Sequence, residues 1–245
     1  MKIAIIGYGT MGKEIEKQAK ILSHQVTRII DVSTENQIYN TSFDEDEVAI
    51  EFSQPNSVIE NLECLLDKKV NVVCGTTGWH KNKSYIRQLV NKNKVGFLYA
   101  TNFAIGTNIF WKTLEKSAQY INKFSECDVM VNEIHHRMKL DSPSGTGVTT
   151  AEVLLKNIDR KKSINMDKID GRIKDEEIHL SSARCGSVVG EHTVIYDSPH
   201  DTIRVSHIGK DRASYAIGAI KCAEWLQKKR GFFSISDYIK DIIKE

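Results

Sequence analysis

The chain is long enough for one large domain or two modest ones, and its charge is nearly balanced. Of its 245 residues 40% are hydrophobic, which is enough for ordinary cores. Lys and Arg number 34 against 32 Asp and Glu, so no positive excess favours nucleic acid or an anionic membrane. No apolar run approaches the roughly 20 residues of a membrane span, and the N-terminal IAIIG is too short for a signal segment. We expect a globular cytoplasmic protein without nucleic-acid or membrane partners.

Five cysteines are scattered along the chain and never form a C-x-x-C pair. Their odd number and wide spacing indicate neither a disulfide framework nor a zinc knuckle. We expect reduced, mostly buried thiols at Cys64, Cys74, Cys127, Cys185 and Cys222.

Strand and helix patterns alternate over about the first hundred residues. Short apolar runs predict strands, and the segments between them have helical spacing or helix-start signals. The expected strands are 2–7, 27–31, 48–52, 70–75 and 95–100, and the expected helices are 11–22, 55–67 and 83–93. This alternation predicts an α/β fold with a doubly wound, Rossmann-like parallel sheet.

The pattern changes near residue 106. The expected elements are a helix at 108–122, a strand at 127–136, a helix with Val148, Ala151, Leu154 and Ile158 on one face, extended segments at 192–196 and 201–207, a helix at 213–226 and a short terminal helix. We therefore expect a dinucleotide-binding domain at 1–106, completed by C-terminal helices within 216–245. Residues 107–215 should form an α+β domain with a mixed sheet.

The segment GYGTMG carries glycines in the G-x-G-x-x-G spacing between a predicted strand and a predicted helix. In that context the glycines permit a tight turn, close approach of the backbone to a pyrophosphate, and close packing of helix on strand. Asp31 ends the next predicted strand, where its carboxylate can accept hydrogen bonds from ribose hydroxyls. An ordinary βα turn would not need this partner. The candidate cofactor contacts here are Gly7, Tyr8, Gly9, Thr10, Met11, Gly12 and Asp31.

Asp31 also bears on the choice of nicotinamide cofactor. Its carboxylate repels a 2′-phosphate, and Val32, Ser33 and Thr34 offer no guanidinium to offset this. NADH is therefore favoured over NADPH. Lys13 and Arg28 keep use of both cofactors open.

Two further loops follow predicted strands, at the edge where ligands bind such sheets. Either loop alone could be a plain turn of small residues, but together they suggest the walls of a nicotinamide pocket. Their residues are Gly75, Thr76 and Thr77 in one loop and Thr101, Asn102 and Phe103 in the other.

Residues 133–147, EIHHRMKLDSPSGTG, concentrate cationic and hydrogen-bonding groups before a helix start. On a strand His135 and His136 point to opposite sides, so they should not bind one metal together. Lys139 and one of the histidines could hold an anionic group. The alternative is a set of solvated surface charges.

The SPSGT part of this stretch predicts a helix N-terminus with Ser144 at or near the N-cap. The amides of Gly145 and Thr146 could then bind a carboxylate. Together with the cationic group nearby, this indicates a dicarboxylate ligand.

The stretch closely resembles the signature E-x-H-H-x-x-K-x-D-[AS]-P-S-G-T of the 4-hydroxy-tetrahydrodipicolinate (dihydrodipicolinate) reductase family. GYGTMG, EFSQP, GTTGW, TNFAIGTN and RCGSVVGEHTV resemble that family's segments in the same order over nearly the whole chain. The resemblance implies NAD(P)H-dependent reduction of 4-hydroxy-tetrahydrodipicolinate to tetrahydrodipicolinate in the diaminopimelate route to lysine. It also implies a homotetramer joined through the sheet of the second domain.

The resemblance implies a role for each matching residue. His135 resembles the family's proton donor or acceptor and Lys139 its second proton donor. His136, Gly145 and Thr146 resemble contacts to substrate carboxylates, and the glycine turn, Asp31 and the two loops resemble cofactor contacts. One departure is Gly147, where the family more often has alanine.

Two other functions share part of this pattern. Another two-domain dehydrogenase, such as an amino-acid dehydrogenase, would use the glycine turn and Asp31 but would not need HHRMKLDSPSGT. A dinucleotide-sensing module would leave His135 and Lys139 without a task.

Overall fold

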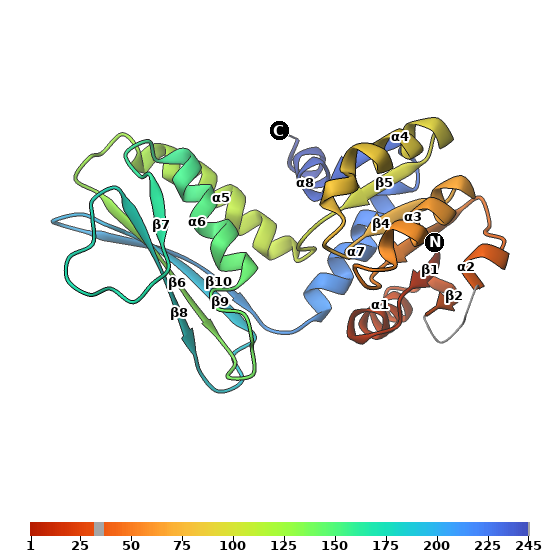
Figure 1. Cartoon of the computed structure of the whole chain (residues 1–245), viewed down its shortest axis with the longest axis horizontal. Helices are drawn as coiled ribbons and strands as arrows, with labels where there is room; N and C mark the ends of the chain where they lie inside the picture. Colours follow the sequence, from red (N-terminus) through yellow and green to blue (C-terminus); the bar gives the residue numbers. More distant parts are fainter. Residues whose placement is uncertain (32–36, 245) are drawn as a thin grey trace. The chain divides into compact units, whose positions relative to one another are not determined.

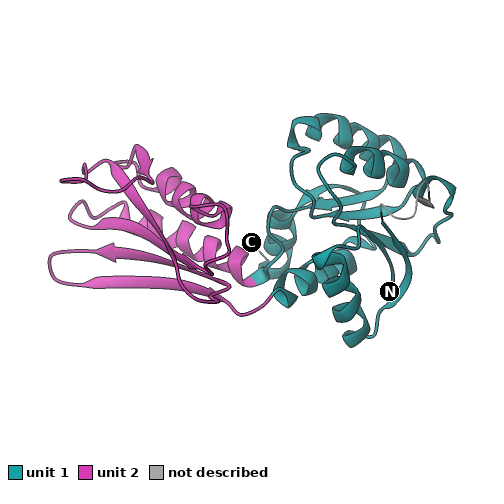
Figure 2. Ribbon diagram, turned by 60° about the horizontal axis from the view of Figure 1, so that its bottom comes forward, with its two compact units in different colours: residues 1–105, 212–245 teal, residues 106–211 magenta. Residues whose placement is uncertain are grey.

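The computed structural model describes residues 1–31 and 37–244. The chain forms two compact units, Met1–Ile105 with Arg212–Glu245 and Gly106–Asp211 (Figure 2). The first boundary lies one residue before the expected one, and the chain returns to the first unit four residues earlier than expected. That the first unit binds the cofactor, and that the second unit binds the substrate and forms the oligomer, remains a prediction.

The first unit is built on a six-stranded parallel sheet in the order β11-β5-β4-β3-β1-β2. Its strands are β1 (Lys2–Ile6), β2 (Gln25–Ile30), β3 (Glu47–Glu51), β4 (Asn71–Cys74), β5 (Gly96–Tyr99) and β11 (Gly231–Ser234). The chain runs from β1 to β2 on one side and then returns to β3 on the other. This reversal opens a crevice at the carboxyl ends of β1 and β3, which is where such sheets bind ligands.

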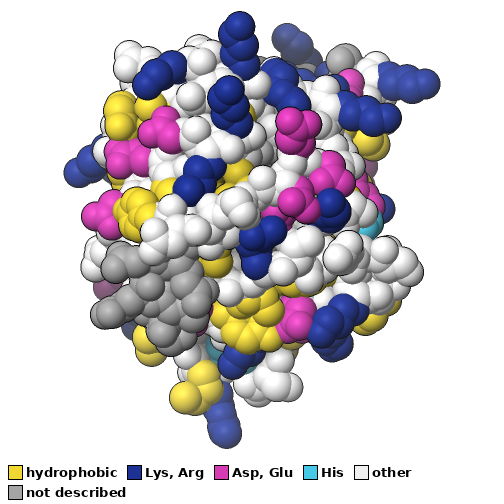
Figure 3. Space-filling view, turned by 90° about the vertical axis from the view of Figure 1, so that its right-hand side faces the viewer, with side chains coloured by type: hydrophobic (Ala, Val, Ile, Leu, Met, Phe, Trp, Pro, Cys, Tyr) yellow, Lys and Arg dark blue, Asp and Glu magenta, His cyan; other side chains and the backbone are white. Residues whose placement is uncertain are grey.

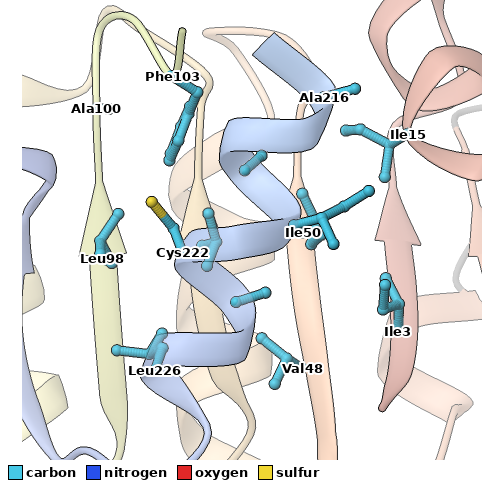
Figure 4. Packing of buried hydrophobic residues seen from close by; sticks show 14 of the residues in the cluster. Ile3, Ile15, Val48, Ile50, Leu98, Ala100, Phe103, Ala216, Cys222 and Leu226 are labelled. Atoms are coloured by element: carbon cyan, nitrogen blue, oxygen red, sulfur yellow. The ribbon is translucent and has the colours of Figure 1, made fainter. Parts of the chain in front are cut away.

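Helices cover both faces of this sheet, as its buried apolar strands require. The helices of the unit are α1 (Thr10–Ile21), α2 (Gln37–Asn40), α3 (Val58–Asp67), α4 (Lys83–Asn93), α7 (Ala213–Leu226) and α8 (Ile235–Ile243), with a 3-10 turn, η1 (His80–Asn82). One buried cluster joins α1, α7 and α8 to the sheet, and another joins α3 and α4 to it. Figure 4 shows α7 against the strands, with Cys222 and Leu226 facing Leu98 and Val48.

The second unit contains a five-stranded mixed sheet in the order β10-β9-β6-β8-β7. Its strands are β6 (Asp128–His135), β7 (Ser163–Asn165), β8 (Glu177–Arg184), β9 (Gly190–Asp197) and β10 (Thr202–Gly209). Strand β6 pairs parallel to β8 and antiparallel to β9. Helices α5 (Ile105–Ile121) and α6 (Gly145–Asn157) lie along one face of the sheet (Figure 1).

Residues of β6 alternate between the two faces of this sheet. Val131, Glu133 and His135 are buried on the helix side, whereas Asn132 and Ile134, on the opposite side, are half-buried. The alternation therefore places a carboxylate and an imidazole side by side beneath α6.

The predicted fold class is confirmed, and the predicted elements of the first hundred residues are present within three residues of their expected bounds. The expected helix start at Pro55 is wrong, because residues 54–57 form a turn in which the Ser57 amide donates to Gln54 O at 3.1 Å. Helix α2 and strands β7, β8 and β11 were not predicted. Pairing with β8, β6 and β5, respectively, determines the three strands.

The surface and the thiols agree with the composition. On the face shown in Figure 3, basic and acidic side chains are interspersed. Cys64, Cys74 and Cys222 are buried free thiols, while Cys127 is half-buried and Cys185 exposed. Among the described residues, no helix has both the length and the apolar character needed to cross a bilayer.

Gly218 permits the close approach of α7 to the backbone that follows β5. A Cβ at this position would lie 1.8 Å from the carbonyl oxygen of Phe103. We expect Gly218→Ala to lower the free energy of unfolding by about 2 kcal/mol or more, because backbone must move. Gly145→Ala, where a Cβ meets nothing within 4 Å, is the control. Equal urea midpoints for the two variants would contradict this packing argument.

Candidate active site

A cleft of about 500 Å³ opens at the carboxyl ends of β1, β3 and β4 in the first unit. The residues that line it are Gly7, Tyr8, Gly9, Thr10, Met11, Asp31, Phe52, Ser53, Gln54, Pro55, Gly75, Thr76 and Thr77. The glycine turn, Asp31 and the loop after β4 thus face one space, at the point where the strand order reverses.

The three glycines of GYGTMG have different geometric reasons to be glycine. Gly7 has φ +89°, and a Cβ there would lie 2.4 Å from Phe52 O. A Cβ on Gly12 would lie 2.2 Å from Gly7 O, so α1 packs against the turn only without a side chain. Gly9, the N-cap of α1, faces open space. The turn therefore leaves room for a pyrophosphate at the helix N-terminus, which fits a dinucleotide.

The loop after β5 lies outside the lining of this cleft. Thr101 is exposed, while Asn102 and Phe103 are buried. The Asn102 side chain accepts a hydrogen bond from the Ala104 amide at 2.9 Å, and the Phe103 ring packs 5.7 Å from that of Phe52. Cofactor contact by these three residues remains a prediction.

The loop after β3, residues 52–55, is part of the cleft and was missed as a site from the sequence. The Phe52 ring covers Gly75, where a Cβ would lie 2.1 Å from the ring. Beneath the loop Glu51 is fully buried and accepts hydrogen bonds from Ser53 N at 3.2 Å and from Asn61 Nδ2 at 3.4 Å. Burial raises the pKa of Glu51. Position after a strand of the sheet, the criterion used for the other loops, would have identified residues 52–55.

The basic residues close to Asp31 in sequence have other partners. Arg28 Nε lies 2.8 Å from Glu47 Oε1, and its Nη1 donates to Ser42 O at 2.6 Å. The Lys13 ammonium lies 5.8 Å from the centre of the Tyr8 ring. Val32, Ser33 and Thr34, part of the argument for NADH, lie outside the described residues.

The second unit contains a buried polar cluster centred on Glu133. Its Oε1 accepts hydrogen bonds from Ser144 N at 2.8 Å and Ser182 Oγ at 2.7 Å. Its Oε2 accepts from Ser144 Oγ and lies 3.4 Å from His192 Nε2. His135 Nδ1 lies 3.8 Å from Oε1. Strands β6, β8 and β9 and the start of α6 thus meet at one carboxylate.

Helix α6 begins as predicted, with Ser144 as its N-cap. Ser144 has φ −73° and ψ 156°, and its Oγ accepts from the Gly147 amide at 3.0 Å. The preceding Ser142–Pro143 bond is cis. Gly145 is exposed with open space around its Cα. A Cβ on Gly147 would lie 2.3 Å from Glu133 Oε2, so this glycine lets the helix approach the carboxylate.

The other two cationic candidates lie in the loop before α6. Lys139 Nζ is 2.7 Å from Asp141 Oδ1, and the Lys139 amide donates to His136 O at 3.1 Å. His136 is half-exposed, unlike buried His135. The two histidines therefore occupy different environments, as their neighbouring positions predicted.

Burial and charge set opposite protonation preferences within the cluster. Burial, reinforced by His192, Lys139 and Arg184, lowers the pKa of His135 to about 4, although Glu133 opposes the shift. Burial alone would raise the pKa of Glu133, but hydrogen bonds from His192, Ser144 and Ser182 hold it well below its usual value. A neutral imidazole thus lies beside an ionised carboxylate at neutral pH.

Two family models together match most of the chain. The family described as "Dihydrodipicolinate reductase, N-terminus" matches residues 1–103, and "Dihydrodipicolinate reductase, C-terminus" matches residues 106–239. The chain belongs to the dihydrodipicolinate reductase family. A 4-hydroxy-tetrahydrodipicolinate reductase of Christiangramia forsetii is 36% identical over 244 residues, covering 100% of both chains. One from Buchnera aphidicola subsp. Acyrthosiphon pisum is 32% identical, covering 92% of this chain and 86% of its own.

Solved structures agree on the fold. Dipicolinate-bound dihydrodipicolinate reductase from Paenisporosarcina sp. TG-14 has a TM-score of 0.77 at 22% identity, covering 97% of this chain and 98% of its own. A probable dehydrogenase from Thermotoga maritima has a TM-score of 0.54 at 11% identity, covering 92% and 89%. The parallel sheet with a second mixed sheet is thus a shared architecture.

In this reductase-family chain, sequence reasoning did not assign the partners of His135. Glu133 lies two residues before His135 in EIHHRMKLDSPSGTG, and His192 lies in RCGSVVGEHTV. Strand alternation could have placed Glu133 and His135 on one face. Pairing of β6 with β9 sets Glu133 opposite His192, which no local pattern shows.

The lowered pKa of His135 makes stability depend on pH. Below pH 6.5, its ordinary pKa, His135 binds a proton in the unfolded chain, whereas in the folded chain it stays neutral down to about pH 4. The contribution of neutral His135 to the free energy of unfolding is therefore fully present above pH 6.5 and is lost as the pH falls toward 4. Between pH 7 and pH 4, the free energy of unfolding should fall by about 2 to 3 kcal/mol less in His135→Gln than in the wild type. Urea unfolding at each pH measures this, and parallel curves would refute it.

Proposed function

We propose that this chain reduces 4-hydroxy-tetrahydrodipicolinate to tetrahydrodipicolinate with NAD(P)H, in the diaminopimelate route to lysine. Family membership over both halves of the chain supports the reaction class. The observation that carries the proposal is the convergence of buried His135, Lys139 and the open N-terminus of α6 in one unit. The other unit offers a cleft with a dinucleotide-type glycine turn.

The cofactor cleft supports the following assignment. The turn residues Gly7–Gly12 bind the pyrophosphate, Asp31 binds the adenosine ribose, and the loop Gly75–Thr77 lines the nicotinamide side. When bound, the nicotinamide supplies the hydride. We propose that Thr101, Asn102 and Phe103, in the loop after β5, make further contacts to the cofactor.

Substrate binding and proton transfer fall to the second unit. The start of α6, with the Gly145 and Thr146 amides, binds one carboxylate of the substrate, and His136 and Lys139 bind the other. Breaking the exposed ion pair with Asp141 costs Lys139 little, because such pairs are weak. His135 or Lys139 then donates the proton that the reduced ring requires.

NADH is the favoured cofactor. Asp31 lines the cleft, and its charge opposes a 2′-phosphate. Arg28, which could have offset that charge, is paired with Glu47 and Ser42 O. The Lys13 ammonium, which lies near the Tyr8 ring, supplies a positive charge that allows weaker use of NADPH.

We also propose a cytoplasmic homotetramer. Among the described residues, no helix covers the second face of the five-stranded sheet, where Met130, Asn132 and Ile134 are half-buried. A strand face that carries both apolar and polar side chains is stabilised when it packs against another copy of the chain. Sedimentation equilibrium of the full chain distinguishes a tetramer from smaller assemblies.

A coupled assay tests the reaction. The product of a dihydrodipicolinate synthase reaction is supplied with NADH, and nicotinamide absorbance is followed. An amino-acid dehydrogenase would instead oxidise NADH with a 2-oxo acid and ammonia, and a sensing module would bind NADH without turnover. Absence of turnover with the synthase product would refute the proposal.

Asp31 should control cofactor preference. We expect kcat/KM to be higher with NADH than with NADPH, and Asp31→Ala to narrow the gap by removing repulsion of the 2′-phosphate. Steady-state kinetics with both cofactors measure this. A preference for NADPH of about tenfold or more in the wild type would contradict it.

Two anion-binding groups should make the site selective for dicarboxylates. Pyridine-2,6-dicarboxylate, which has two carboxylates and no reducible imine, should compete with the substrate. Pyridine-2-carboxylate should be a much weaker competitor. Inhibition constants for the pair decide the point, and equal values would rule out two separate carboxylate contacts.

His135 and Lys139 should act mainly in the chemical step. His135→Gln and Lys139→Met should each lower kcat by roughly a hundredfold or more. KM should rise more for Lys139→Met, and the double variant should be less impaired than the product of both effects. NADH affinity by fluorescence titration is the control. Near-wild-type kcat in either single variant would show that the proton transfer is assigned to the wrong residue.

A further inference from the structure

We propose that Glu133 is a positioning residue that sets which ring nitrogen of His135 carries the proton, leaving Nε2 as the atom that exchanges protons with the substrate. The proposal rests on the proposed function for its catalytic consequence. It concerns the side of the imidazole that points into the protein, whereas substrate contacts concern the other side.

The Glu133 carboxylate is held in place by donors from three directions. Ser144 N and Oγ reach it from the start of α6, Ser182 Oγ from β8, and His192 Nε2 from β9. Its side chain has no solvent exposure. A buried carboxylate with this many donors is ionised and has little freedom to move.

His135 Nδ1 is directed into this cluster. The atom is buried and has no hydrogen-bond partner among the described residues, and Glu133 Oε1 is 3.8 Å away. A neutral imidazole carries its proton on one nitrogen, and the other nitrogen keeps its lone pair. A fixed anion near Nδ1 favours the tautomer protonated there, and a small rotation of the ring would close a charge-assisted hydrogen bond.

The remaining charged or titratable groups around His135 do not oppose this assignment. His192 on β9, Lys139 in the loop before α6 and Arg184 on β8 all disfavour a second proton on the ring, whereas Glu133 favours it. Glu133 is thus the group that stabilises the imidazolium formed during proton exchange. An acid that orients a histidine and stabilises its cation follows the logic of catalytic triads.

Gly190 lies next to the Nε2 edge of the ring and adds no side chain there. A Cβ at this position of β9 would lie 3.0 Å from His135 Nε2 and 3.7 Å from His192 Cε1. The absence of a side chain leaves space next to Nε2. The ring therefore has a closed edge at Nδ1, facing an anion, and a roomier edge at Nε2.

A bound cation is the competing interpretation of the same residues. Donor atoms of Glu133, His135 and His192 lie within 4.8 Å of one another. However, both oxygens of Glu133 already accept hydrogen bonds from Ser144 and Ser182, and a metal would have to displace these donors. The cluster is therefore better explained as a hydrogen-bonded charge network.

The tautomer can be measured directly in the unmodified full chain. In ¹⁵N-histidine-labelled protein near pH 8, long-range ¹H–¹⁵N spectra distinguish a protonated from an unprotonated ring nitrogen, and His135→Gln identifies the His135 signals. We expect protonated Nδ1 and unprotonated Nε2. A proton on Nε2, or a shift of the His135 and His192 signals on addition of a stoichiometric amount of Zn²⁺, would overturn the proposal.

Substitution of Glu133 tests the catalytic consequence. Glu133→Gln should lower kcat by about tenfold or more with KM within about threefold. Because the imidazolium is the donating form and loss of the Glu133 charge lowers its pKa, the alkaline limb of the kcat–pH profile should move to lower pH. Ser182→Ala is the matched control, because it removes a donor to Oε1 but keeps the charge. It should retain the Nδ1 tautomer and lose less than about threefold in kcat. Equal effects of the two variants would overturn the proposal.

Failure of this proposal can be distinguished from failure of the proposed function. The wild-type tautomer is read without substrate and without any Glu133 variant, since His135→Gln serves only to identify the His135 signals. A chain with the expected tautomer but no reductase activity would refute the proposed function alone. A chain with reductase activity and the Nε2-protonated tautomer would refute the role of Glu133 alone.

Discussion

The contacts of the buried carboxylate of Glu133 organise the polar half of the second unit. A buried charge without partners is costly, so the surrounding chain must supply donors in fixed positions. Ser144 supplies two of them while capping α6, and Ser182 and His192 come from neighbouring strands. The same contacts that satisfy the carboxylate therefore also fix the start of α6 against β6.

Other residues around the cluster follow from this requirement. Gly147 suits this position because a Cβ there would lie 2.3 Å from Glu133 Oε2. Arg184 donates to Ser182 Oγ and Asp141 O, which ties the loop before α6 to β8. The catalytic candidates thus stand on a polar scaffold, and this is consistent with a site in which protonation states are controlled by burial.

In the first unit, the glycine turn lets the backbone approach a phosphate closely. A Cβ on Gly7 would clash with Phe52 O, and a Cβ on Gly12 would clash with Gly7 O. Gly9 leaves the helix N-terminus open to the cleft. Beneath this cleft Glu51 ties the loop after β3 to its surroundings through Ser53 and Asn61. An amino-acid dehydrogenase could share all of this, so the second unit and family membership carry the specificity of the proposed reaction.

The sequence alone determined the alternation of strands and helices, the glycine turn with Asp31, the Ser144 cap and the family signature. These are local patterns, because period, capping and turn chemistry act over a few residues. Tertiary structure decided what local patterns do not encode. Strand β11 exists through its pairing with β5, the loop after β5 lies outside the cleft lining, and Glu133 meets His192 through the register of β6 with β9. Glu133 and His192, 59 positions apart in sequence, become neighbours by sheet pairing, whose energy depends on the whole fold rather than on either segment.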